Sequence, residues 1–373
     1  MARRPRGARA FSFNVDSRVR AWRRISAERR AKGSARRATD MRDHVSSASV
    51  SGVLRLRQPG PRGSPFAYPP GVASIKLGDV RDRARAAFLG LALGDALGAT
   101  VEFMTPGEIC AAHGVHHQIT GGGWLHLKPG QVTDDTEMSL CLARAIDDAD
   151  GWDARRAADR LAAWMRGRPV DVGSTVRKGI RRYMLDGTLE GPPNEGDAGN
   201  GAAMRMVPVA LATLGDPALL ARVAVEQARI THHHPLSDAA CAHIGELVQL
   251  GCLGHSMTEL RRASDALAER VPFFRFEPWR GLATGYVVDT LQTVLHFFHT
   301  TGGFEECLVA VVNQGGDADT IGAIAGAIAG AYYGPDELPR RWVRRLDAAV
   351  RAQIEALSDR LVSLSPLARH PPV

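Results

Sequence analysis

The sequence predicts an all-α protein whose helices form one domain that begins near Arg81. From that residue onward, apolar side chains recur at the three- and four-residue spacing of helices in run after run. Runs in which apolar and polar residues alternate, as they do in strands, are scarce. Short connections containing glycine and proline separate the helical runs. We therefore predict a single bundle of about a dozen helices.

Residues 1–80 have a different composition, rich in arginine, serine, proline and glycine. They contain 18 lysines and arginines but only 5 aspartates and glutamates, a net charge of +13. Because the whole chain carries +7, the remaining residues carry −6. A segment of this composition cannot bury enough apolar surface to offset the entropy of ordering it. We therefore predict a disordered extension over residues 1–80 and a folded domain over residues 81–373.

Two origins for this extension are open. It is either a basic arm that binds nucleic acid or the result of a start codon assigned too far upstream. The arm lacks the interleaved aromatic residues that stack on bases, so no nucleic-acid partner is expected.

The first predicted helix, residues 81–97, and a late one, residues 321–334, carry glycines every four residues. These are Gly90, Gly94 and, directly after the end of the first helix, Gly98, and in the second helix Gly322, Gly326 and Gly330. Glycine costs about 1 kcal/mol relative to alanine inside a helix, and close approach of two backbones is a compensating reason. We therefore predict that these helices cross in contact. That crossing brings Asp95 and Glu102 close to the acidic turn that precedes the second helix.

The other predicted helices each have an apolar face at helical spacing. A loop containing Gly121-Gly122-Gly123-Trp124 precedes them. In chain order they cover residues 138–148, 152–166, 174–185, 203–214, 218–230, 237–250, 257–268, 281–298, 304–312 and 338–364.

Two acidic turns stand at helix starts far apart in the sequence, Thr133-Asp134-Asp135-Thr136 and Asp317-Ala318-Asp319-Thr320. Ordinary helix capping explains each turn when it is taken alone. Neighbouring carboxylates repel each other unless a cation or a proton is supplied, and oxygen-only ligands suit hard divalent ions. Together the turns favour a site for Mg²⁺ or Mn²⁺ with room for two ions. The predicted metal ligands are Thr133, Asp134, Asp135, Asp317, Asp319 and Thr320.

A third polar segment, residues 195–205, is a glycine-rich loop that leads into a helix. Its Asp197 and Asn200 can present a carboxylate base and an amide to a sugar or a phosphate. Free N–H groups at the helix start would add affinity for an anion. Taken alone, the segment is slightly better explained as an ordinary turn with a helix cap.

Three consecutive histidines, beginning at His232, raise the question of a zinc site. They cannot all face one ion from a regular helix, and no cluster of His or Cys partners accompanies them. A loop in which one or two of them line a pocket is therefore expected. Trp124 and Tyr286 can stack on a base or a ribose, although lone aromatic residues usually belong to the core.

The five cysteines indicate the setting of the protein. They are an odd number without a Cys-x-x-Cys pair, which argues against a disulfide framework and against a zinc ribbon. No apolar run reaches the roughly 20 residues needed to cross a bilayer. The early twin arginines lack the apolar segment of a secretory signal. These features favour a cytoplasmic protein.

Five motifs, taken in order along the chain, resemble those of the ADP-ribosylglycohydrolase family. They are Gly94-Asp95-Ala96-Leu97-Gly98 with Glu102, Thr133-Asp134-Asp135-Thr136, Gly199-Asn200-Gly201 with Met204-Arg205, Thr231-His232 with His234-Pro235, and Gly315-Gly316-Asp317-Ala318-Asp319-Thr320. The resemblance runs from about residue 81 to about residue 347, which is nearly all of the organised chain, and implies the orthogonal multi-helix bundle of that family. Residues 1–80 have no counterpart in it.

The resemblance also implies a site. Two divalent cations, Mn²⁺ or Mg²⁺, would be held by the six predicted ligands, and catalysis would involve Asp197 as general base and the metal-linked Asp317. The pyrophosphate of the substrate would lie at helix N-termini and Arg205. The implied substrate-binding residues are Asn200, Gly201, Tyr286, Trp124, Gly122 and His232.

The implied activity is metal-dependent hydrolysis of the N-glycosidic bond between ADP-ribose and a protein arginine. Within the family, motifs such as Gly121-Gly122-Gly123-Trp124 are similar to those of members that reactivate the nitrogenase iron protein. The ADP-ribosylated iron protein is therefore the expected substrate, and a PII-type nitrogen-signalling protein is an implied partner. The alternatives are a hydrolase of serine-linked or O-acetyl-ADP-ribose and a non-catalytic, crystallin-like relative. A non-catalytic relative would be expected to lose metal ligands, and all six are present here.

Overall fold

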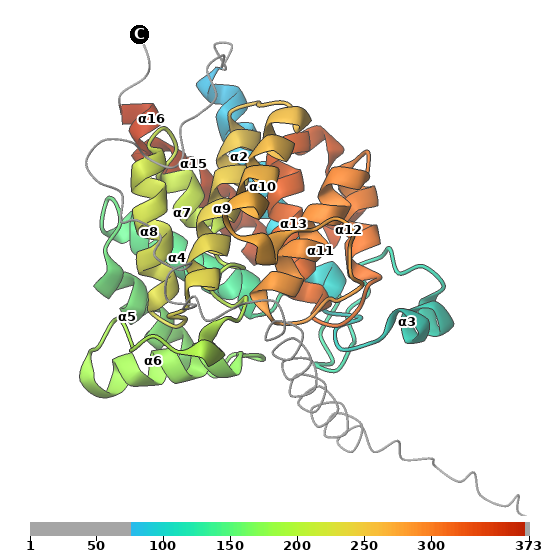
Figure 1. The fold of residues 1–373 in the computed structure, drawn as a ribbon, viewed down its shortest axis with the longest axis horizontal. Helices are drawn as coiled ribbons and strands as arrows, with labels where there is room; N and C mark the ends of the chain where they lie inside the picture. Colours follow the sequence, from blue (N-terminus) through green and yellow to red (C-terminus); the bar gives the residue numbers. More distant parts are fainter. Residues whose placement is uncertain (1–75, 370–373) are drawn as a thin grey trace, which may run out of the picture. The chain divides into compact units, whose positions relative to one another are not determined.

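A computed structural model describes residues 76–369, and within them it confirms the all-α prediction (Figure 1). Fifteen α-helices and three short 3₁₀ helices are present in this range, and the only β-type pairings there are two isolated bridges. None of these helices combines the length and the apolar character needed to span a membrane. The α-helices are α2 (Leu77–Gly98), α3 (Pro106–His113), α4 (Asp134–Asp148), α5 (Ala154–Arg166), α6 (Ser174–Asp186), α7 (Val207–Ala212), α8 (Pro217–Arg229), α9 (Pro235–Cys252), α10 (Met257–Arg270), α11 (Val287–Thr300), α12 (Phe304–Val312), α13 (Ala318–Tyr333), α14 (Arg340–Arg345), α15 (Ala348–Leu364) and α16 (Pro366–Arg369).

Helices α2 and α13 form the centre of the fold, and their backbones touch as the glycine spacing predicts. A Cβ atom built on Gly94 would lie 1.9 Å from the carbonyl oxygen of Gly322, and one on Gly90 would lie 2.1 Å from that of Gly326. Only glycine permits this separation, because any side chain would push the two helices apart. Helices α4, α7, α9, α12 and α15 contact α2, and α9, α11 and α12 contact α13.

The close contact between α2 and α13 continues to the C-terminal end of α2 and the N-terminal end of α13. A Cβ atom on Gly98, the last residue of α2, would lie 2.1 Å from the carbonyl oxygen of Ala318, the first residue of α13. The segment after α2 is also bonded to the turn before α13, since the Phe103 N–H donates to the Gly316 carbonyl and the Gly316 N–H donates to the Met104 carbonyl. The C-terminal end of α2 therefore meets the N-terminal end of α13.

Several predicted helix boundaries are wrong for identifiable reasons. The helix predicted over residues 338–364 is two helices, because Asp347 accepts the backbone N–H groups of Ala349 and Val350 and so begins α15 anew. The helix predicted from residue 281 begins only at Val287, and residues 281–286 form a loop instead. Tertiary contacts fix that loop, because the N–H of Asp317 donates to the Ala283 carbonyl.

Helix α3 was not predicted at all. It is eight residues long, with a single buried side chain, Ile109, so its apolar periodicity is too short to read. Its start does carry a sequence signal, a capping box in which the Glu108 N–H donates to the Thr105 hydroxyl and the Glu108 carboxylate accepts the Thr105 N–H. Predictions about residues 1–75 lie outside the described residues.

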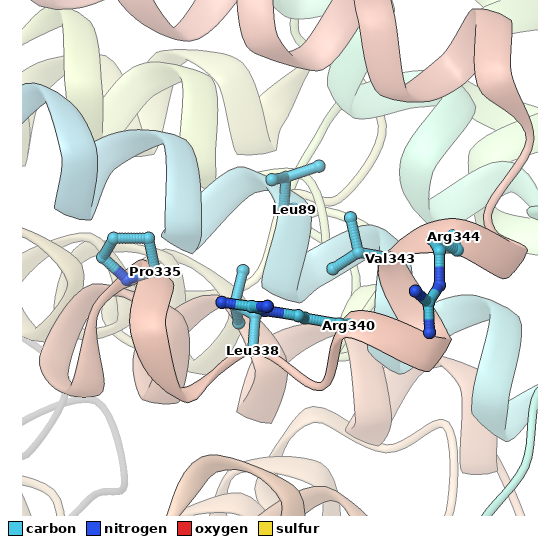
Figure 2. A pocket seen from close by; sticks show the side chains of 6 residues that line it. All are labelled: Leu89, Pro335, Leu338, Arg340, Val343 and Arg344. Carbon is cyan, nitrogen blue, oxygen red and sulfur yellow. The ribbon is translucent and has the colours of Figure 1, made fainter.

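A hollow of about 300 Å³ lies beside α2 (Figure 2). It contains none of the predicted site residues. Leu89, the residue of α2 that lines it, lies about 14 Å along the helix from Gly98, at a rise of about 1.5 Å per residue. Its lining residues are Leu89, Pro335, Leu338, Arg340, Val343 and Arg344. The candidate site therefore lies elsewhere, at the junction of the ends of α2 and α13.

The close contact between α2 and α13 can be tested by replacing glycine with alanine at two positions of α2, one inside the contact and one outside it. We expect Gly94→Ala to lower the free energy of unfolding by about 3 kcal/mol or more, because the new methyl group overlaps the Gly322 carbonyl. Gly78→Ala, in the same helix with no atom within 4 Å of the new Cβ, should raise it by about 0.5–1 kcal/mol. Urea denaturation measures both values. Equal effects at the two positions would contradict the close approach.

Candidate active site and metal centre

The two acidic turns, far apart in the sequence, meet in the structure. Thr133 is the N-cap residue of α4 and Asp317 is the N-cap residue of α13, yet neither side chain caps its own helix. Capping therefore does not explain these two side chains. Carboxylate oxygens of Glu102, Asp317 and Asp319 all lie within 4.8 Å of one another, close enough to share one cation.

Asp135 connects the two helix starts. Its Oδ2 accepts hydrogen bonds from the Thr133 hydroxyl at 3.2 Å and from the Thr320 hydroxyl at 3.4 Å. Its Oδ1 is buried and has no hydrogen-bond partner among the described residues. A buried carboxylate oxygen without a donor is costly, and a divalent cation would satisfy it. The donor set around it contains only carboxylate and hydroxyl oxygens, which fits Mg²⁺ or Mn²⁺.

The electrostatics of the cluster support the same interpretation. Burial raises the pKa of Glu102, Asp134, Asp135 and Asp319 well above the ordinary range, and neighbouring carboxylates raise it further. Burial also raises the pKa of Asp317. Within residues 76–369, no lysine or arginine forms an ion pair with any of these five side chains. The part of the chain that the structure describes therefore gives the acidic cluster no cationic partner.

Asp95 has a different role from the other carboxylates. Its two oxygens accept the backbone N–H groups of Thr133 and Thr136, at 3.1–3.2 Å, and both threonine hydroxyls. Burial raises its pKa to about 6, and these hydrogen bonds oppose the rise. Asp95 thus holds the start of α4 against α2. As the helix crossing predicts, Asp95 lies near the acidic turn before α13, since its charge contributes to the raised pKa of Asp319.

Glu102 lies in the cluster, as the helix crossing predicts, although it was not among the predicted metal ligands. Its Oε2 accepts the indole N–H of Trp124, whose ring also contacts that of Phe103 at 5.3 Å between centroids. The glycine-rich loop makes this possible: a Cβ on Gly123 would lie 2.4 Å from the Ala99 carbonyl oxygen. Trp124 therefore contacts the site through Glu102. Gly122 lies in the same loop, where it forms an antiparallel bridge with Leu127.

Asp171 is a site residue that the sequence analysis missed. Its charge contributes to the raised pKa of Glu102, Asp134, Asp317 and Asp319, so it lies near enough to these carboxylates to oppose their ionisation. It lies in the loop between α5 and α6, and the N–H of the nearby Gly173 donates to Asp134 Oδ2 at 3.4 Å. A single aspartate in a loop, without an acidic neighbour, gives no sequence signal.

The glycine-rich loop of residues 195–205 reaches the cluster through Asn200. Its amide nitrogen donates to Asp317 Oδ2 at 2.6 Å and to the Thr290 hydroxyl at 2.9 Å. Gly199 forms an antiparallel bridge with Tyr286, the half-buried N-cap residue of α11. Asn200 and Tyr286 therefore flank the carboxylates.

Asp197 lies in the same loop but makes different contacts. It is buried, its Oδ1 lies 3.3 Å from Lys178 Nζ, and its Oδ2 accepts the His233 N–H at 3.4 Å. The cluster of Glu102, Asp317 and Asp319 does not include it. Its role as general base stays a prediction.

His232 and Arg205 are buried behind this loop. The His232 ring lies against Gly199 and Gly201, and burial, with a contribution from the charge of Arg205, lowers its pKa to about 3, so it is neutral. Arg205 is fully buried and donates to Gln227 and to the Thr231 hydroxyl. The prediction that Arg205 receives a pyrophosphate is wrong, because its guanidinium is enclosed in the core.

The fold and this site define the class of the protein: it belongs to the ADP-ribosylglycohydrolase family, whose profile matches residues 77–371. The chain is 54% identical over 288 residues to the ADP-ribosyl-[dinitrogen reductase] glycohydrolase of Rhodospirillum rubrum, a match that spans 77% of this chain and 98% of that protein. It is 30% identical over 300 residues to the ADP-ribosylarginine hydrolase Tri1 of Serratia proteamaculans, spanning 76% of this chain and 80% of that protein.

A solved structure is similar as well. The chain superposes on a protein described as an ADP-ribosylglycohydrolase-related protein complex with a TM-score of 0.68 and 34% sequence identity. The match covers 77% of this chain and 99% of that one. The predicted family is therefore confirmed by sequence and by fold.

The loss of folding stability caused by ionised carboxylates in the cluster can be measured in protein from which EDTA has removed the metal. The folded-state pKa of Asp135 is raised, so its contribution to stability is present at low pH and is lost as pH rises through that value. Asp135→Asn cannot ionise. We expect this variant to be more stable than the metal-free wild type at pH 8, by about 1–3 kcal/mol, and to lose most of that advantage at pH 5.

Mn²⁺ should reverse the order of the two proteins. The wild type gains stability on addition of the ion because the cation compensates the buried charge, whereas Asp135→Asn gains less. Thermal unfolding at each pH, with and without Mn²⁺, measures both effects. If Asp135→Asn is the less stable protein at pH 8 without metal, Asp135 acts as an ordinary structural residue.

Proposed function

We propose that the protein hydrolyses the N-glycosidic bond between ADP-ribose and an arginine side chain, and that its substrate is ADP-ribosylated dinitrogen reductase, the nitrogenase iron protein. The observation that carries the proposal is the buried, oxygen-only cluster at the meeting point of α4 and α13 in a chain of this family. The names of the relatives from Rhodospirillum rubrum and Serratia proteamaculans support the arginine linkage.

The proposed cofactor is a pair of divalent cations, Mn²⁺ or Mg²⁺. Their ligands would be the six predicted residues, Thr133, Asp134, Asp135, Asp317, Asp319 and Thr320, joined by Glu102. Bound there, the ions would stabilise negative charge on ribose oxygens or on an attacking water. Asp95 and Asn200 would orient the ligands, because they hydrogen-bond Thr133 and Asp317 respectively.

The chain itself would supply the proton transfers and the substrate contacts. Two carboxylates are candidates for the base that activates water: Asp171, which lies beside the cluster, and Asp197, which is paired with Lys178. The proton that the substrate guanidinium retains lets the leaving group depart as neutral guanidine and not as an anion, and the proton released by the attacking water, passed through the base, restores the guanidinium. The proposed contacts to the ADP-ribose remain those predicted: Asn200, Gly201, Tyr286, Trp124, Gly122 and His232.

The proposal extends to the setting and the domain organisation. The five free cysteines support a reducing, cytoplasmic environment. We propose that residues 81–373 form the catalytic domain and that residues 1–80 are an extension. Helix α2 begins at Leu77, so the domain begins a few residues earlier than this boundary. No feature of the described residues favours the PII-type partner or a crystallin-like role. A hydrolase of serine-linked ADP-ribose remains the second candidate for the reaction.

The function is tested with purified protein and three substrates. We expect Mn²⁺-dependent release of ADP-ribose from free ADP-ribosylarginine and from ADP-ribosylated dinitrogen reductase, and little release from a serine-linked peptide. Mass spectrometry measures the mass lost from each substrate. We expect Asp317→Ala to lower kcat/KM on both arginine-linked substrates by about 10³-fold and to reduce bound Mn²⁺, because it removes a ligand. A variant with full metal content and full activity would rule out this site.

The identity of the general base is tested by Asp171→Asn and Asp197→Asn, measured side by side. The amide cannot accept the proton of the water, so the variant at the base should lose about 10²–10⁴-fold in kcat while its Mn²⁺ content stays near that of the wild type. The other variant should lose far less. Loss of metal from Asp171→Asn would instead identify Asp171 as a ligand, and equal small losses would exclude both residues.

A further inference from the structure

Helix α6 presents a continuous face of cationic and apolar side chains to solvent. Arg177, Lys178, Arg181, Met184 and Leu185, which we call the α6 outer face, fall within an arc of about 120° at 100° per residue. The opposite side of the helix is buried. Figure 1 shows α6 at the lower edge of the bundle, next to α5, which packs against it.

The side chains of the α6 outer face have few partners within residues 76–369. Arg177 and Arg181 are exposed and form no ion pair with any described residue, while Lys178 pairs with Asp197. Leu185 is 86% exposed and Met184 is 39% exposed. Isolated exposed leucines are ordinary, but here two apolar side chains extend a row of uncompensated cations on one helix face. Together they form a surface suited to an acidic partner with an apolar contact.

This surface is continuous with the catalytic site. The loop that leads into α6 carries Asp171, and Gly173 of the same loop contacts Asp134. Lys178, one turn into the helix, reaches Asp197. From Ser174 to Leu185 the helix rises about 16 Å, so its far end extends well away from the loop that contacts Asp134, over a length that fits the footprint of a protein.

We infer that the α6 outer face is the docking surface for the protein that carries the ADP-ribosylated arginine, and that it binds an acidic surface of that protein beside the modified residue. The inference rests on the proposed function and adds how a protein substrate is distinguished from a small one. Opposite charges steer the two proteins together and set the orientation of the bound substrate, while Leu185 supplies the apolar contact. Lys178 is the residue of the α6 outer face that pairs with a proposed site residue, Asp197, within the part of the chain that the structure describes. Turnover of free ADP-ribosylarginine should therefore not depend on Arg177, Arg181 or Leu185.

The test compares two substrates for each variant, with Mn²⁺ present. Arg177→Glu/Arg181→Glu should lower kcat/KM on ADP-ribosylated dinitrogen reductase about tenfold, mainly through KM, and should leave kcat/KM on free ADP-ribosylarginine unchanged. Leu185→Ser, which removes the apolar contact, should lower the first value several-fold and also leave the second unchanged. Raising the salt concentration should weaken turnover of the protein substrate in the wild type more than in the double variant.

The matched control is Arg340→Glu/Arg344→Glu on α14. These arginines have the same four-residue spacing, are exposed and form no ion pair with a described residue, and they border the hollow of Figure 2 away from the carboxylates. Full activity of this control on both substrates is expected. If Arg177→Glu/Arg181→Glu behaves like the control on the protein substrate, or if both double variants lose activity equally, the docking surface is wrong. If the wild type fails on free ADP-ribosylarginine, the proposed function itself is wrong.

Discussion

The contact between the backbones of α2 and α13 is the constraint on which the rest of the structure depends. It fixes where two sets of acidic residues arrive, because Gly98 at the end of α2 touches Ala318 at the start of α13. Asp95 on α2 then holds the start of α4 by hydrogen bonds to Thr133 and Thr136. Three helix ends that are distant in sequence are thereby brought together. The glycines weaken each helix locally, and the compensation is a close junction that larger residues would prevent.

The carboxylates at this junction divide into two kinds. Asp95 accepts donors on both oxygens, so the protein itself satisfies its charge. Asp135 keeps one buried oxygen without a donor, and Glu102, Asp317 and Asp319 face one another at short range. A fold that needed these acids only for structure would pair them as it pairs Asp95. The difference indicates that the second group is arranged for a ligand that the chain does not provide.

Much of this could be predicted from the sequence, and the exceptions have physical causes. Glycines at a fixed four-residue spacing predict that two helices cross in contact, because close approach of two backbones explains their repeated use. Paired aspartates at two helix starts predict a shared site, because their carboxylates need a common cation. Asp171 was missed because only tertiary packing of its loop brings it to the cluster. Arg205, which follows the polar loop, was expected at the pyrophosphate, whereas in the structure it is buried in the core, where its Nε and Nη2 donate to Gln227 and Thr231. The break before α15 depends on one capping aspartate, Asp347, inside an otherwise continuous apolar pattern.

The negative charge of the acidic cluster affects the binding of the substrate as well as its hydrolysis. ADP-ribose carries an anionic pyrophosphate, and a group of buried carboxylates repels it. Arg205, the cation expected to offset this repulsion, points into the core instead. The exposed cations of α6 begin one turn beyond the loop that carries Asp171, and the first of them near the site, Lys178, is already paired with Asp197. Divalent cations in the cluster would offset this repulsion, so loss of metal should lower the affinity for ADP-ribose as well as turnover. Titration calorimetry with ADP-ribose, with and without Mn²⁺, would measure this, and equal affinity in both conditions would contradict it.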